Sequence, residues 1–347
     1  MGVFSMSDIR KYAFFHFKKS LIRLAVAAIV GLILVDSFVL DVYYTTGRSG
    51  DKDHYLYISF TTFFLFFSFL AMVMPILELH PFHNRCALDT FFSIPCKRSS
   101  LLLTHIFNGA LQILIILILT CTWTAIRFIK FPEIEVFNML PFFIGILSLS
   151  LAFYFINCFA FLTANRIIDG VILTLLFIGV PLALLVFMIE IADSLGRFSE
   201  TKFFNLSAPL NMMILTEYFE DLFSDSNWRI DNAVLGTGVN LGILFTIFLG
   251  LAAIVLCVWL FKKKKAEKAG AISDAWWGYP FLIPFLGFNL VIYFGSFLWG
   301  VLVGIMAFIG YVIYRRSARL KIHEWILIGA ITILGCIPEN LIKLLLP

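Results

Sequence analysis

The sequence predicts an all-α polytopic membrane protein, with a six-span core, about three further C-terminal crossings and an N-terminal amphipathic interfacial helix. The chain is 61% hydrophobic, only 14% charged, and has a mean hydropathy of +0.96. Soluble domains are about half apolar and about a quarter charged. The apolar runs reach the roughly 20 residues that a membrane helix needs, and they are too long for the strands of about ten residues in outer-membrane barrels.

The N-terminal segment has the pattern of an amphipathic helix. Ile9, Tyr12, Ala13 and His16 lie opposite or between basic residues in the printed sequence. We expect residues 1–20 to form a cytoplasmic helix that lies on the inner membrane surface. Its basic residues are Arg10, Lys11, Lys18 and Lys19.

Six apolar runs within residues 21–261 predict the core spans. They are Leu21–Leu40, Leu56–Leu77, His105–Ile126, Met139–Leu162, Gly170–Glu190 and Ala233–Phe261. Residues 78–104 are then the longest cytoplasmic loop between core spans, and residues 191–232 are the longest outward loop. Within the outward loop, the apolar spacing over residues 209–223 predicts a helix resting on the outer mouth.

The C-terminal part, residues 281–347, follows a basic cytoplasmic loop over residues 262–280. The apolar block 279–314 would measure about 54 Å as one helix, whereas a bilayer core is about 30 Å thick. Basic residues flank the block at both ends, so two short spans with a turn near Gly295 and Ser296 fit best. A tilted span with a re-entrant segment is the alternative. A last span is expected over residues 325–345.

The four consecutive lysines 262–265 set the orientation of the chain. Loops that remain in the cytoplasm carry the excess of Lys and Arg, so this cluster places the end of the sixth span inside. Under that assignment the N-terminus is cytoplasmic, and 18 of the 26 Lys and Arg residues fall inside. The expected location is the plasma membrane.

Motifs for enzymatic chemistry are missing from the sequence. It contains no GxxxxGK[ST] phosphate loop, no HExxH and no paired-carboxylate or Ser/His signature. We therefore expect no catalytic residue, no cofactor, no bound metal and no nucleic-acid partner. Glu78, His80 and His83 come close in the sequence, but Pro81 interrupts helical spacing and a zinc site needs three or four fixed ligands. We interpret them as an interfacial loop.

Several motifs resemble those of one transporter family. The stretch from Leu88 to Arg98 (LDTFFSIPCKR) before an apolar span resembles the segment of ABC-2 type transporter permeases where a leucine-proline stretch precedes a basic pair. Residues 264–270 (KKAEKAG), 206–209 (LSAP) and 316–321 (RSARLK) are similar to stretches of the bacterial subgroup tied to peptide-antibiotic resistance and acetoin-type exporters. Their order around six spans covers most of the chain.

This resemblance implies a permease subunit without an ATPase of its own. It would pair with a second permease subunit, identical or not, and carry ATP-binding cassette ATPase subunits that bind the ATP. The N-terminal helix and the loop 78–104 would dock on the ATPase, and the cargo would be amphipathic or hydrophobic, such as an antimicrobial peptide. The expected ATPase-coupling residues are Leu88, Phe91, Phe92, Pro95, Lys97 and Arg98. The alternatives are an ion-coupled secondary transporter and a non-transporting sensor or scaffold of an antibiotic-response complex.

Overall fold

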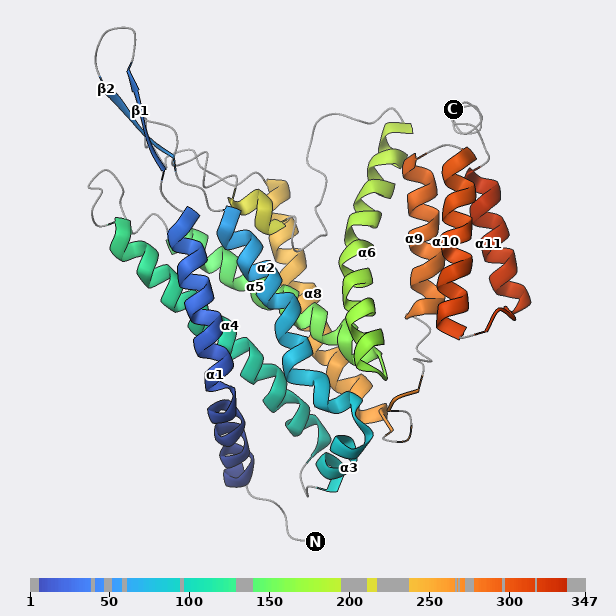
Figure 1. Cartoon of the computed structure of the whole chain (residues 1–347), viewed down its shortest axis with the longest axis horizontal. Coiled ribbons are helices and arrows are strands. Elements are labelled where there is room, and N and C mark those ends of the chain that lie inside the picture. The colour runs from blue at the N-terminus through green and yellow to red at the C-terminus, as the bar shows by residue number, and fades with distance from the viewer. Residues whose placement is uncertain are drawn as a thin grey trace. The chain divides into compact units, whose positions relative to one another are not determined.

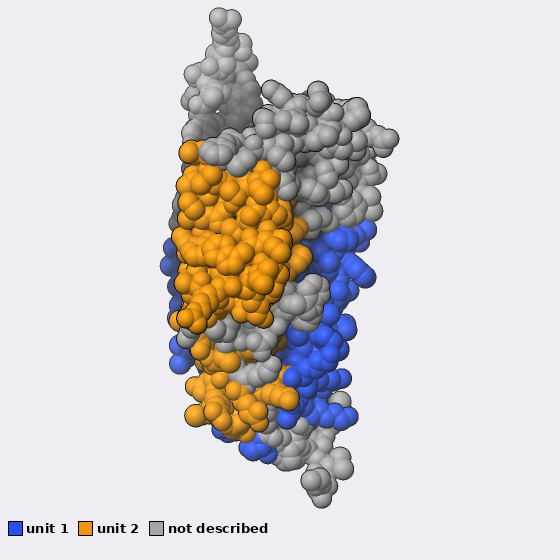
Figure 2. Space-filling view, turned by 90° about the vertical axis from the view of Figure 1, so that its right-hand side faces the viewer, with its two compact units in different colours: residues 1–79, 90–159, 208–263 blue, residues 80–89, 160–207, 264–347 orange. Residues whose placement is uncertain are grey.

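The computed structural model consists mainly of long helices (Figure 1). It describes residues 6–38, 41–46, 52–57, 61–93, 97–128, 140–194, 211–216, 237–265, 267, 269–271, 278–294, 297–315 and 317–335. The chain divides into two compact units, coloured separately in Figure 2. Unit 1 comprises residues 1–79, 90–159 and 208–263, and unit 2 comprises residues 80–89, 160–207 and 264–347.

Unit 1 is built on a group of packed helices. They are α1 (Met6–Phe38), α2 (Thr61–Leu79), α4 (Arg98–Phe128), most of α5 (Leu140–Thr163) and α8 (Thr237–Lys263). Helix α1 packs on α4 and α2, and α4 also packs on α2 and α8. The short helix α3 (Arg85–Ser93) follows a 3-10 turn, His80–His83, and the boundary between the units falls within it.

The first helix differs from the prediction of a separate interfacial segment. Helix α1 is continuous for 33 residues, from the basic N-terminal region through the first predicted span. Tyr12 and His16, expected to face the headgroups, instead contact His105 of α4. A protein surface has replaced the lipid surface as the partner of this face, because α4 offers it hydrogen bonds as well as apolar contact.

A short antiparallel hairpin is the exception to the all-α prediction. Strand β1 (Asp41–Thr46) pairs with β2 (Lys52–Tyr57) in the register Asp41 to Tyr57 and Thr46 to Lys52. These strands are rich in Tyr, Thr and Val, which favour extended backbone. The second span was predicted to begin at Leu56, but this residue belongs to β2, and α2 begins only at Thr61.

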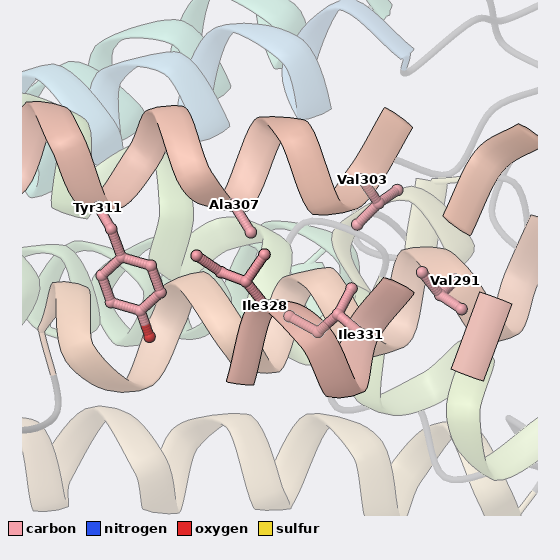
Figure 3. Packing of buried hydrophobic residues seen from close by; sticks show 6 residues of the cluster. All are labelled: Val291, Val303, Ala307, Tyr311, Ile328 and Ile331. Atoms are coloured by element: carbon pink, nitrogen blue, oxygen red, sulfur yellow. The ribbon is translucent and has the colours of Figure 1, made fainter. Parts of the chain in front are cut away.

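Unit 2 contains α6 (Ile167–Ser194), α9 (Tyr279–Phe294), α10 (Phe297–Arg315) and α11 (Ile322–Gly335). The apolar block 279–314 is therefore two helices, as the preferred interpretation predicted. They run antiparallel, because Gly287 lies beside Val303 and Gly310 lies beside Ile283. Six buried residues of α9, α10 and α11 form the core shown in Figure 3: Val291, Val303, Ala307, Tyr311, Ile328 and Ile331.

The lengths and compositions of the helices agree with a multi-pass membrane protein. Among the described residues, five helices are long and apolar enough to cross a bilayer, and three shorter apolar helices accompany them. Helix α8 also presents an exposed apolar stripe, Leu244, Phe248, Leu251 and Val255, at helical spacing. Exposed apolar area of this kind marks a surface that faces lipid or another protein. In the outward loop, residues 211–216 are helical, within the helix predicted there.

Candidate functional site

A buried carboxylate lies at the C-terminal end of α2. Glu78 has no exposed surface, although it occupies the last turn of a helix that was predicted to open into a loop. A buried ionised side chain is costly unless it is paired and hydrogen-bonded. The contacts of Glu78 meet this requirement from two other helices.

Helix α1 supplies two partners at a spacing of seven residues, which places them on one face. Arg23 Nη2 donates to Glu78 Oε1 over 2.6 Å, and Arg23 Nη1 donates to the Leu77 carbonyl over 3.1 Å. His16 Nε2 lies 2.8 Å from Glu78 Oε2. The two residues therefore hold both carboxylate oxygens.

Helix α4 supplies three polar side chains from one face. Gln112 Nε2 and Asn108 Nδ2 donate to Glu78 Oε1 over 2.7 and 3.0 Å. His105 Nδ1 lies 3.1 Å from the Glu78 backbone carbonyl oxygen and 3.8 Å from Oε2. We call this group the Glu78 cluster; its members are His16, Arg23, Glu78, His105, Asn108 and Gln112.

The cluster continues outward through aromatic side chains. Tyr12 Oη lies 2.9 Å from His105 Nε2, and the His16 and His105 rings are 4.0 Å apart between centroids. Phe91 of α3 packs edge-on against His105 with centroids 5.7 Å apart. His105 therefore contacts groups from α1, α2 and α3, and its side chain is buried.

A glycine makes room for this arrangement. A Cβ at Gly109 of α4 would overlap the Tyr154 hydroxyl and press on Glu78 Cγ. Tyr154 is itself fully buried and donates to the Ile106 carbonyl over 2.9 Å. The absent side chain thus leaves room at α4 for the Tyr154 hydroxyl and for the Glu78 side chain.

The predicted ATPase-coupling residues have different environments. Lys97 and Arg98 are exposed at the start of α4, and Phe91 is half-buried against His105. Leu88 is fully buried within this chain. The backbone of Phe92 belongs to α3, while its side chain and all of Pro95 lie outside the described residues.

The four basic residues of the N-terminal helix, Arg10, Lys11, Lys18 and Lys19, are all exposed along α1. Their side chains lie in the same helix as His16 and Arg23, which point to the cluster. Helix α1 thus keeps a basic exposed surface beside a face that packs on the protein. The positions remain compatible with the predicted docking role, which contacts within the chain do not test.

The four lysines at the end of α8, residues 262–265, include one that turns toward the protein. Lys264 donates to the carbonyls of Ala164 and Leu162 over 2.9 and 3.4 Å, at the end of α5. Burial lowers its pKa to about 7 from an ordinary value of 10.5. Lys262 and Lys263 remain exposed, and Lys263 lies 3.6 Å from the Trp259 ring centre. The lysines of residues 262–265 therefore lie in different environments.

The histidines of the E-L-H-P-F-H stretch do not join Glu78. His83 is buried and lies within 3.1 Å of the Phe161 carbonyl oxygen in unit 2, while His80 is exposed. Sequence reasoning missed that His16, Arg23 and His105 would gather on Glu78. The signal available was spacing: residues 105, 108 and 112 share one face of α4, as do residues 16 and 23 on α1.

Comparison with known proteins does not add a family to this description. No protein-family model, no curated protein and no solved structure matches the chain.

Proposed function

We propose that the chain is the membrane permease subunit of an ATP-binding cassette exporter, with ATP bound and hydrolysed by a separate ATPase subunit. A second permease subunit would complete the pathway, and the cargo would be an amphipathic or hydrophobic molecule such as an antimicrobial peptide. The proposal starts from the order of the family-like motifs along the chain.

One structural observation supports it further: both predicted docking elements contact the Glu78 cluster. Helix α1 reaches Glu78 through His16 and Arg23, and α3 reaches it through Phe91 and His105. A partner that pushes on the exposed ends of α1 and α3 would therefore move α2 and α4 as well. This is a mechanical connection of the kind that coupling to an ATPase requires.

Two exposed basic residues are consistent with the proposed docking surface for the ATPase. Lys97 and Arg98 lie a few residues after α3, and both side chains are exposed. Charge complementarity of this kind steers association and sets orientation. Leu88, also predicted to belong to this surface, is buried within the chain.

Purification of the intact chain from its own host in mild detergent tests the proposal. We expect a nucleotide-binding protein to co-purify, and we expect Lys97→Glu with Arg98→Glu to abolish the association. The matched control is Lys262→Glu with Lys263→Glu, which changes the same charge on two exposed lysines. Equal loss in both double variants would indicate a general charge effect, and the absence of any ATPase would refute the mechanism.

The ion-coupled alternative gains one observation from the structure. Glu78 lies inside a helix long enough to span a bilayer, and buried ionisable residues at such positions commonly serve ion pathways. Uptake into sealed vesicles would separate the two functions. Movement driven by an ion gradient without ATP would favour the alternative, and movement that requires ATP and the ATPase would favour the exporter.

A further inference from the structure

We infer that His16, Glu78 and His105 form a binding site for a divalent transition metal, with Zn²⁺ as the ion that best fits these donors. One nitrogen of each histidine and one carboxylate oxygen all lie within 4.8 Å of one another. Two histidines and one glutamate are an established zinc donor set, which leaves a fourth position for water. This inference is independent of the transport function.

The distances between the donor atoms are close to those that a tetrahedral ion imposes. Zinc bonds of about 2.0–2.2 Å at tetrahedral angles place neighbouring ligand atoms about 3.3 Å apart. The separation from Glu78 Oε2 is 2.8 Å to His16 Nε2 and 3.8 Å to His105 Nδ1. These two values bracket the required one. Metal binding would also replace the hydrogen bond between His105 Nδ1 and the Glu78 carbonyl oxygen, so Nδ1 would have to release its proton.

The surroundings orient the donors. Tyr12 lies 2.9 Å from His105 Nε2, the ring nitrogen opposite the donor, where a hydrogen bond fixes the ring. Arg23, Asn108 and Gln112 all donate to Glu78 Oε1, which leaves Oε2 directed at the two histidines. The carboxylate would therefore bind through one oxygen.

Two buried acceptors beside the carboxylate lack a partner. Asn108 Oδ1 and Gln112 Oε1 make no hydrogen bond, although their amide nitrogens bind Glu78. Unpaired buried acceptors are uncommon, and a water molecule held beside the carboxylate would supply the missing donors. His16 keeps 17% of its side chain exposed, which gives an ion a route to the site.

Arg23 provides a charge test of the site. Its guanidinium opposes a second cation on the same carboxylate, so Arg23→Gln should bind Zn²⁺ more tightly than the unchanged protein. Loss of Arg23 also removes an ion pair, and bound Zn²⁺ should restore part of the lost thermal stability. A purely structural salt bridge predicts neither effect.

The experiment measures Zn²⁺ bound to the full chain in detergent, by equilibrium dialysis and elemental analysis, together with the thermal shift caused by Zn²⁺ and by Mg²⁺. We expect one Zn²⁺ per chain, a stabilising shift with Zn²⁺ alone, and loss of both in His16→Gln and His105→Gln. Tyr12→Phe should weaken binding about tenfold. The matched control is His323→Gln, which alters an exposed histidine of α11.

Retention of the ion in a folded His16→Gln variant would overturn the inference, as would equal loss in His323→Gln. His16 is the decisive position because it is partly exposed on α1, so its replacement should disturb folding less than that of His105. If His105→Gln fails to fold, the site can still be tested by the visible absorption of bound Co²⁺, measured in the unchanged chain and in His16→Gln. Bands typical of tetrahedral coordination must appear in the first and be missing from the second.

Discussion

Arg23 and Glu78 form a short ion pair, 2.6 Å between Nη2 and Oε1, that ties α1 to the end of α2. The carboxylate is fully buried while the guanidinium keeps 31% of its side chain exposed. The pair is therefore asymmetric: the guanidinium is partly solvated, whereas the carboxylate depends on its protein partners.

This asymmetry predicts unequal effects of the two substitutions. Arg23→Gln leaves a buried charge with one partner fewer and should lower the free energy of unfolding by about 1–3 kcal/mol. Glu78→Gln removes the charge but keeps the shape, so the double variant should be no less stable than Arg23→Gln alone. Thermal melts of the four proteins in one detergent give the coupling energy. If the effects of the two single substitutions add up to the effect of the double variant, the Arg23–Glu78 interaction contributes nothing to stability.

Gly109→Ala should destabilise unit 1 by about 1–3 kcal/mol, because the added methyl group overlaps the Tyr154 hydroxyl next to Glu78. Gly329→Ala is the matched control, since a Cβ at this helical position of α11 meets no atom within 4 Å. That change should be neutral or stabilising by up to about 1 kcal/mol. Thermal unfolding of both variants checks the prediction; similar losses would show that the overlap is relieved by other means.

Phe91→Ala should uncouple ATP hydrolysis from transport without releasing the ATPase. Phe91 is half-buried on His105 and so belongs to the connection rather than to the exposed docking surface. The measurement compares co-purification, ATPase rate and ATP-dependent cargo movement in the same preparation. Phe91→Leu, which retains apolar bulk, should recover part of the transport. Loss of the ATPase from Phe91→Ala would instead make this residue a docking contact.

The predicted orientation places α3, lysines 262–265 and the loop after α10 on the cytoplasmic side. Single cysteines at native Cys86, at Lys265→Cys and at Ser317→Cys occupy exposed positions in these three segments. An impermeant thiol reagent should label all three in inside-out vesicles and none in right-side-out vesicles. Asp53→Cys in β2 should show the reverse. Labelling of Cys86 and position 265 from opposite faces is incompatible with docking to one ATPase.

Lys264 should make stability depend on pH. Its folded pKa of about 7 lies below the ordinary 10.5, so between these values the unfolded chain binds more protons and stability rises with pH. Below pH 7 both states are protonated and the unfavourable contribution is complete. Relative to Lys264→Met, the unchanged protein should therefore gain stability from pH 7 to pH 9. Lys262→Met, at an exposed lysine, should show no such trend.

The long helices were predictable because length and apolar composition suffice to recognise them. The spans predicted at 105–126 and 170–190 fall within α4 and α6, and the span predicted at 139–162 matches α5 to within one residue at each end. The division of block 279–314 follows from its length and flanking charges. The boundaries erred where polar residues were used to end a span. Residues 98–104 were assigned to a loop but form the first turns of α4. Polar side chains at the start of a helix can remain partly exposed, so they do not mark its end.

The Glu78 cluster could not be predicted in the same way. Glu78 and His105 were recognised as polar residues at span ends, but only tertiary packing shows that α1 covers them. Asn108 and Gln112 both donate to this one carboxylate. Transport, partners and cargo remain predictions, because the contacts within one chain do not test them.

The two contacts that α1 makes with Glu78 are separated by seven residues, about 10 Å along the helix. Sliding or twisting of α1 would break these two contacts and leave the buried Glu78 carboxylate without these partners. Tilting α1 together with α2 and α4 would preserve the contacts. Force applied at the N-terminus should therefore propagate as rotation of a stiff three-helix lever.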